Sequence, residues 1–349
     1  MVATLLAGIS IANAATWFVS TDGTSGAAGT QAAPFADLAE AAGRAGPGDI
    51  IRIAGGTYRY AQPVRLQRNG TAEQPIRVEP ADGARPVFDF SAQEFKQGFS
   101  GLMVRGDHWH LIGLEVIGAA RNGIQVSGHH NIIAHCVAHQ NQDSGIQLTA
   151  PASHNLVLDC DSYRNVDRPT LGENADGFAA KFQIGPGNVF RGCRAWENAD
   201  DGFDLWKAAE SVRIEHCVAF RNGINLWGIA GFTGNGNGFK LGGDYIAGAH
   251  LVIGCVAMDQ PVRGFDQNNN MAGITLEHCT ATRCKTGFSF GKTPAEGRHV
   301  LRDNVSWDAP ARLVEGTVEE NNVWTNADGT PAQATIVPPT KPGTPTRKP

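Results

Sequence analysis

The sequence predicts an all-β protein, a parallel β-helix whose coils stack along one axis. The first observation is a set of six cysteines in matching contexts, at intervals of 24, 33, 24, 38 and 24 residues: Cys136, Cys160, Cys193, Cys217, Cys255 and Cys279. The second is a repeated phrase, Gly-Phe or Gly-Ile followed by a short strand pattern. The third is the composition, with 43 glycines and only 18% charged residues, which is typical of turn-rich β proteins.

A basic coil of about 24 residues with two insertions accounts for all five cysteine intervals, and coils of this size favour a parallel β-helix. Equivalent residues of neighbouring coils then stack one strand spacing apart. Stacked thiols point in parallel and the chain has an odd number of cysteines, seven, so we expect mostly free thiols in the core. We also expect a stack of asparagines that satisfies turn backbone groups: Asn122, Asn141, Asn165, Asn198 and Asn222.

The pattern along the chain predicts three segments. Residues 1–14 resemble a secretory signal peptide, with Ala12-Asn13-Ala14 as a small-residue cleavage site. The β-helix itself is expected over residues 15–326, with a helix within Pro34–Ala45 that caps its open end. Residues 327–349 are rich in Pro and Thr and predict a disordered tail. We therefore expect a secreted protein, extracellular or periplasmic; the alternative is an apolar N-terminal segment that stays in the mature chain.

Charge and hydropathy narrow the classes of partner. The formal net charge of −5 argues against a nucleic-acid-binding protein, which would show a basic face. No apolar run is long enough to span a bilayer. A capped β-helix is expected to be a monomer. None of this argues against an acidic polysaccharide as partner, because a local cluster can override the global sign of the charge.

Ionisable residues gather in only three copies of the repeated phrase. Aligning the copies on their glycines places Asp176 and Asp201 in one column and Asp204 and Lys240 in another. Asp200 adds a further carboxylate at the same corner. Four neighbouring carboxylates repel one another without a counter-charge, and hard oxygen ligands on a fairly open face suit Ca²⁺ best. The alternative is that these aspartates only serve the turns, for which Asp-Gly is a common pair.

A calcium ion beside a lysine suits one reaction on acidic sugars. A metal on the uronate carboxylate stabilises the charge that forms when the C5 proton leaves, and Lys240 is the candidate base. Elimination of the C4 oxygen then gives a 4,5-unsaturated sugar. Whether Asp204 contacts Lys240 directly stays open at this point. Further residues are candidates for lining the sugar groove, the last two from later coils: Lys181, Trp206, Arg263 and Lys285.

The same region resembles the calcium-dependent pectate lyases of polysaccharide lyase family 9. The resemblance rests on residues 109–290, above all on Asn174-Ala-Asp-Gly-Phe-Ala-Ala-Lys181, Asp200-Asp-Gly-Phe-Asp-Leu-Trp206 and Gly234-Asn-Gly-Asn-Gly-Phe-Lys-Leu-Gly-Gly243. It implies a right-handed β-helix, polygalacturonate or pectate as substrate and Lys240 as the Brønsted base. It also implies that calcium is bound by Asp176, Asp200, Asp201 and Asp204.

Three other functions remain open at this stage. The first is a lyase that acts on another uronic-acid polymer, such as rhamnogalacturonan or glucuronan. The second is an inverting polygalacturonase-like hydrolase, for which Asp200-Asp201 offers paired carboxylates but the Gly-His-Gly and Arg-Ile-Lys motifs are missing. The third is a non-catalytic, calcium-braced module that binds polysaccharide; Lys240 argues against it, because a structural metal site gains nothing from an adjacent cation.

Overall fold

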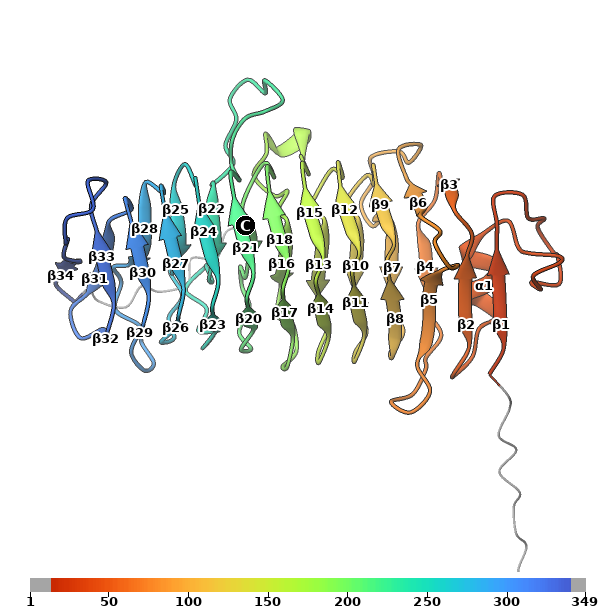
Figure 1. Ribbon diagram of the computed structural model, residues 1–349, viewed down its shortest axis with the longest axis horizontal. Coiled ribbons are helices and arrows are strands. Elements are labelled where there is room, and N and C mark those ends of the chain that lie inside the picture. The colour runs from red at the N-terminus through yellow and green to blue at the C-terminus, as the bar shows by residue number, and fades with distance from the viewer. Residues whose placement is uncertain (1–13, 340–349) are drawn as a thin grey trace, which may run out of the picture.

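The computed structural model describes residues 14–339 as an elongated stack of coils (Figure 1). Each regular coil contributes one strand to each of three parallel sheets, which contain 12, 11 and 11 strands. The prediction of an all-β parallel β-helix is therefore confirmed.

The strands of each sheet follow one another in chain order along the stack. The first sheet is β1 (Thr16–Val19), β2 (Ile50–Ile53), β5 (Ile76–Pro80), β8 (Trp109–Ile112), β11 (Ile132–Ala134), β14 (Leu156–Leu158), β17 (Val189–Arg191), β20 (Arg213–Glu215), β23 (Leu251–Ile253), β26 (Thr275–Glu277), β29 (Val300–Arg302) and β32 (Val318–Glu320). The second sheet is β4 (Val64–Leu66), β7 (Leu102–Val104), β10 (Ile124–Val126), β13 (Ile146–Thr149), β16 (Phe178–Lys181), β19 (Phe203–Asp204), β22 (Asn237–Lys240), β25 (Arg263–Asp266), β28 (Thr286–Phe290), β31 (Ala311–Val314) and β34 (Thr335–Val337). The third sheet is β3 (Gly56–Arg59), β6 (Pro86–Asp89), β9 (Glu115–Ile117), β12 (Val137–His139), β15 (Asp161–Tyr163), β18 (Arg194–Trp196), β21 (Val218–Phe220), β24 (Val256–Met258), β27 (Thr280–Thr282), β30 (Val305–Trp307) and β33 (Val323–Thr325).

The expected capping helix is present as α1 (Leu38–Arg44), beside β1 and β2 at the N-terminal end of the stack (Figure 1). Its first turn is capped by Asp37, whose carboxylate accepts a hydrogen bond from the Ala39 backbone N–H at 2.6 Å. Leu38 and Ala41 are fully buried in the core of the first coils. The helix therefore covers apolar side chains that the first coil would otherwise expose.

The repeated Gly-Phe phrase builds an internal column of stacked rings under the second sheet. The ring centroids of consecutive members lie 4.8–5.0 Å apart, in the order Phe178, Phe203, Phe239, Phe265 and Phe288. The glycine before each ring leaves room for the next coil: a Cβ on Gly202 would lie 2.6 Å from the Gly238 carbonyl oxygen. The phrase is therefore set by packing between coils, and the residue after each phenylalanine points away from the core.

Two other columns match the sequence predictions. All seven cysteines are buried and free, and they include the six of the regular series. In the asparagine column, the side chain of one coil accepts a hydrogen bond from the backbone N–H of the coil before it, as Asn165 does from Asn141 and Asn198 from Asn165. Asn222 continues the column, but Asn122 lies outside it, because Ala119 is the residue whose N–H bonds to Asn141.

Both insertions rise from the same edge of the stack (Figure 1). The first includes a 3₁₀ turn (Arg168–Thr170) and precedes β16, and the second precedes β22. They contact one another, since the Thr233 backbone N–H donates to the Leu171 carbonyl at 2.9 Å. They therefore form one wall over the middle coils.

The C-terminal boundary of the fold lies later than the sequence indicated. Strand β34 falls within the expected disordered tail, yet it pairs in parallel with β31 through Ile336 and Leu313. The β-helix therefore extends past residue 326. Residues 1–13, nearly the whole expected signal peptide, lie outside the described residues, as does the end of the tail. None of the helices in the described part is long and apolar enough to cross a membrane.

A second amide column under the first sheet contains two histidines in place of asparagines. Asn155 and Asn188 each accept a backbone N–H from the preceding coil. Further along, His250 Nδ1 accepts from Val212 N–H at 3.2 Å and His299 Nδ1 from Ile274 N–H at 3.3 Å. Burial lowers the pKa of His250 from 6.5 to about 3, so this ring stays neutral in the folded protein.

We predict that His250→Asn makes the protein more resistant to acid. The unfolded chain takes up a proton on His250 below about pH 6.5 while the folded chain does not, so stability is lost as pH falls, by about 2–3 kcal/mol near pH 4.5. Asn keeps an acceptor and cannot titrate. Thermal unfolding followed by circular dichroism should show a smaller fall in Tm from neutral to acidic pH for the variant. His278→Asn, at an exposed position, is the control, and equal acid sensitivity of His250→Asn and wild type would contradict the prediction.

Candidate active site

The aspartates and Lys240 gather on the outward side of β16, β19 and β22 in the second sheet. Asp204 of β19 lies in register with Lys240 of β22, as the sequence alignment predicted. Asp201 stacks on Asp176, since its backbone N–H lies 3.3 Å from Asp176 Oδ1. Asp200 completes the group, and one ligand oxygen from each of the four aspartates lies within 4.8 Å of the others. The predicted cluster is therefore present as one site.

Each carboxylate is held by fixed donors. Asn235 donates to Asp200 Oδ1 through its backbone and its amide, at 2.6 and 2.7 Å, and Asn237 does the same for Asp201 Oδ1 at 2.8 and 2.9 Å. The Ser144 hydroxyl donates to Asp176 Oδ2 at 2.9 Å. These donors orient the acidic group before any ligand arrives.

Two buried lysines partly neutralise the four aspartates. Lys181 Nζ lies 2.6 Å from Asp176 Oδ2 and 2.7 Å from Asp204 Oδ2. Lys240 Nζ lies 3.1 Å from Asp201 Oδ2 and 3.3 Å from Asp204 Oδ2. Four carboxylates against two ammonium groups leave two negative charges, which is the charge that one divalent cation balances.

Two oxygens of the cluster lack hydrogen bonds. Asp200 Oδ2 is buried with no partner among the described residues, and Asp201 Oδ2 has only the Lys240 ammonium near it, outside hydrogen-bond geometry. A buried carboxylate oxygen without a donor costs free energy unless a cation binds it. The donor set is made of hard oxygens, so the residues fit a cation of the calcium type.

The electrostatics of the cluster reflect the same imbalance. Burial, opposed by Lys181 but reinforced by Asp204 and Asp201, raises the pKa of Asp176 to about 7. Burial and the adjacent Asp201 also raise the pKa of Asp200 well above its ordinary value. Asp204 differs: burial would raise its pKa, but Lys181 and Lys240 outweigh burial and hold the pKa below the ordinary value. Without a cation, the cluster therefore resists full ionisation.

The contact between Asp204 and Lys240 that the sequence left open is a direct one. Burial lowers the pKa of Lys240, but Asp204, Asp201 and Asp200 outweigh burial and hold the pKa well above the usual lysine value. With these aspartates around it, Lys240 is therefore an ammonium group and not a base. The aspartates that hold its proton are the same ones that a cation would neutralise.

A hollow of about 340 Å³ opens directly over this group. Lys240, Lys181 and Trp206 line it together with Asn174 and Asn235 from the two insertions. Lys181 thus lines the groove as expected, but its ammonium is held by two of the aspartates. Trp206 is half-buried in the wall, with the Lys207 ammonium 4.3 Å from its ring centroid. Asn235 and Asn237 were present in the repeated phrase, but the phrase alone does not indicate that each donates to an aspartate of the cluster.

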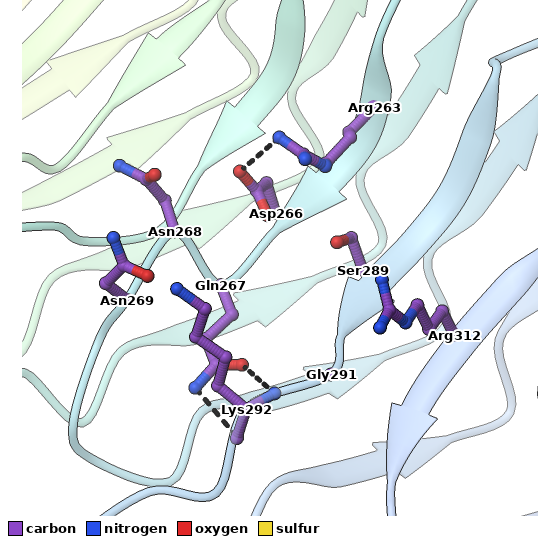
Figure 2. A pocket seen from close by; sticks show the side chains of 9 residues that line it. All are labelled: Arg263, Asp266, Gln267, Asn268, Asn269, Ser289, Gly291, Lys292 and Arg312. Carbon is purple, nitrogen blue, oxygen red and sulfur yellow. Dashed lines mark hydrogen bonds and ion pairs between the residues drawn. The ribbon is translucent and has the colours of Figure 1, made fainter. Parts of the chain in front are cut away.

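The remaining two candidates have different positions. Arg263 lines a second hollow further along the second sheet, where it pairs with Asp266 at 3.1 Å (Figure 2). Lys285 is exposed and lies outside the described linings of both hollows. Arg263 is thus brought to the same face as Lys240, and Lys285 is not part of either hollow.

Comparison with known proteins agrees with this architecture. Residues 17–307 match the family described as "Pel9A-like, right handed beta helix region". The chain belongs to the Pel9A-like β-helix family. It is 38% identical to pectate lyase L of Dickeya chrysanthemi over 315 residues, covering 88% of this chain and 74% of that protein.

Solved structures extend the comparison. The crystal structure of pectate lyase Pel9A superposes with a TM-score of 0.85 at 37% identity, over 93% of this chain and 83% of that one. A rhamnogalacturonan lyase superposes with a TM-score of 0.73 at 27% identity, over 83% and 82% of the two chains. The resemblance to polysaccharide lyase family 9 and the right-handed β-helix expected from it are confirmed.

We predict that Lys181→Met destabilises the protein in the presence of a chelator. The substitution leaves Asp176 and Asp204 buried without the counter-charge that lies at 2.6 and 2.7 Å, and loss of one partner of a buried ion pair costs about 3 kcal/mol. Urea unfolding followed by tryptophan fluorescence should show a lower midpoint. Lys285→Met, which removes an exposed lysine, should leave the midpoint unchanged, and an equal midpoint for both variants would contradict the structural role of Lys181.

Proposed function

We propose that the protein is a calcium-dependent pectate lyase that cleaves polygalacturonate by β-elimination. The observation that carries the proposal is the cluster of four buried aspartates beside Lys240, under an open hollow, in which Asp200 Oδ2 and Asp201 Oδ2 accept no hydrogen bond from the described residues. The names of its relatives support the reaction class, since pectate lyase L and Pel9A belong to the same family. Such an enzyme meets its polymer outside the cytoplasm, in line with the expected secretion.

Each group of the site has a distinct role in this proposal. Asp176, Asp200, Asp201 and Asp204 would hold the calcium ion, and Asp200 Oδ2 and Asp201 Oδ2 are the carboxylate oxygens of this set that accept no hydrogen bond within the described chain. When bound, the ion supplies positive charge next to the uronate carboxylate and so favours loss of the C5 proton.

Lys240 is the proposed base. Its Nζ lies between Asp201 and Asp204, which position it at the floor of the hollow. Lys240 must first release its own proton to solvent, which alkaline pH favours. The neutral amine then takes the C5 proton, the C–H electron pair forms the C4=C5 double bond, and the C4–O bond breaks with its electrons on the leaving oxygen. The products are an unsaturated uronate and a shortened chain, and the proton stays on Lys240 until solvent or the leaving group removes it.

A second substrate has a specific observation in its favour. The rhamnogalacturonan lyase that superposes on this chain shares the fold at 27% identity, which makes rhamnogalacturonan the second candidate polymer after polygalacturonate. Both polymers would give a conjugated unsaturated uronate. The same absorbance assay, run on each polymer separately, therefore distinguishes the two candidate substrates.

We predict ultraviolet absorbance from unsaturated uronate when polygalacturonate is mixed with the protein and Ca²⁺ at alkaline pH, and none with chelator. Lys240→Ala should lower kcat about a thousandfold, since a positioned base contributes on this order. New reducing ends without absorbance would indicate hydrolysis instead. Activity on rhamnogalacturonan but not on polygalacturonate would make rhamnogalacturonan the substrate. No activity on any uronic-acid polymer would reject the lyase function.

We predict that Asp200→Asn does not destabilise the protein in chelator but makes it less stable than the wild type when Ca²⁺ is present. In chelator the variant should be at least as stable as wild type, because burial disfavours the Asp200 carboxylate. With Ca²⁺ the wild type should gain stability that the variant does not, about 2.7 kcal/mol at a hundred times the dissociation constant. Differential scanning calorimetry measures both effects.

The control for this prediction is Asp259→Asn, which removes an aspartate of an exposed ion pair with Arg283. It should respond to Ca²⁺ as the wild type does. An equal calcium response in Asp200→Asn and wild type would remove Asp200 from the metal site.

A further inference from the structure

The second hollow on the sheet that carries the active site has no role in the chemistry described above. It lies over β25, β28 and β31, and its lining includes Arg263, Ser289, Lys292 and Arg312 (Figure 2). Its volume is about 240 Å³. Strand register places Asp266, Ser289 and Arg312 in the same side-chain column as Lys240, one coil after another.

The charge of this hollow is opposite to that of the whole chain. Three cations line it, Arg263, Lys292 and Arg312, against one acid, Asp266. Asp266 is buried and is neutralised by Arg263 at 3.1 Å. Lys292 and Arg312 form no ion pair with any described residue, so two positive charges remain on a protein whose formal net charge is −5. A local excess of this kind concentrates anions.

The hollow is partly fixed in shape. Gln267 donates to the Lys292 carbonyl at 3.0 Å and accepts from the Lys292 backbone N–H at 3.1 Å, which holds the root of that side chain (Figure 2). In Figure 2 the Arg312 guanidinium lies beside Ser289, whereas the Lys292 ammonium extends toward Asn268 and Asn269 at the other end of the hollow. A guanidinium beside a hydroxyl suits a carboxylate with a neighbouring sugar hydroxyl, and the Lys292 ammonium adds positive charge at the other end of the hollow.

The two hollows adjoin. Asn268 lines both the hollow over Lys240 and the second one. From Lys240 to Arg312 the column crosses three coil steps, about 14 Å at the usual strand spacing. A sugar chain that reaches the active site and continues along the sheet therefore passes over Arg312.

We propose that Arg312 and Ser289 form a remote subsite that binds the carboxylate of a uronate several sugar units from the bond that is cleaved, with Lys292 adding positive charge to the same hollow. This inference rests on the proposed function for the identity of the polymer, and it adds a determinant of chain length. Because the subsite is far from the reacting atoms, it acts on substrate binding and leaves the chemical step alone.

The test compares oligogalacturonates of different length on the calcium-loaded enzyme. Arg312→Ala should raise KM for the hexamer about tenfold with little change in kcat, and should raise KM for the trimer far less. Lys292→Ala should act in the same direction. Arg302→Ala removes an equal charge from β29 on the first sheet and is the matched control, expected to keep the wild-type length dependence. An unchanged ratio of hexamer to trimer KM in Arg312→Ala overturns the subsite.

A binding measurement separates this inference from the proposed function. Calorimetric titration of hexagalacturonate into Lys240→Ala and into the double variant Lys240→Ala/Arg312→Ala needs no turnover. Tenfold weaker binding by the double variant supports the subsite even where the wild type cleaves nothing, an outcome that would reject the lyase alone. Equal binding by the two proteins together with lyase activity of the wild type would reject the subsite and leave the lyase standing.

Discussion

The register of the parallel coils is the constraint on which the rest of the structure depends. Each strand of the second sheet pairs with the next at a fixed offset, so Phe203 lies over Phe239 inside while Asp204 lies over Lys240 outside. A slip of one residue would exchange these two faces and place carboxylates among the stacked rings. The glycine before each ring and the buried asparagine column oppose such a slip, because both are fixed by contacts between neighbouring coils. The position of Asp204 beside Lys240 is thus set by the same contacts that hold the core.

The candidate active site gathers buried ionisable groups that the regular coils keep apart. In the described chain, neutral buried atoms such as Asn131 Nδ2 and Gln260 Nε2 also lack hydrogen bonds, but Asp200 Oδ2 and Asp201 Oδ2 belong to carboxylates that lie within one cluster of four. Buried charge of this kind persists only where the surroundings hold it, and here the long, regular core supplies that stability. The two lysines line the hollow together but differ in their partners, since Lys181 lies between Asp176 and Asp204 and Lys240 between Asp201 and Asp204. The two ammonium groups therefore offset part of the buried negative charge of the cluster.

Most of the fold and the acidic cluster could be predicted because a repeat converts sequence spacing into spatial neighbourhood. Asp204 and Lys240 are 36 residues apart, yet the alignment of the phrases placed them together. Other features could not be predicted, because alignment gives the direction of a side chain but not its length or bend. The alignment directed Lys181 outward, and only the structure shows its flexible stem returning to Asp176 and Asp204. The pairing of β34 was missed for a related reason, since three strand residues carry little signal within a Pro-rich stretch.

The insertions explain how a symmetrical scaffold acquires one site. A β-helix repeats its surface at every coil, and outward columns alone would offer similar grooves along the whole second sheet. The two insertions interrupt that repetition at β16 and β22, and they contact one another through Leu171 and Thr233. Asn174 and Asn235 then enter the hollow from the side, and Asn235 also fixes Asp200. Because Asn235 both lines the hollow and donates to Asp200, the shape of the groove and the geometry of the acidic cluster depend on the same insertion.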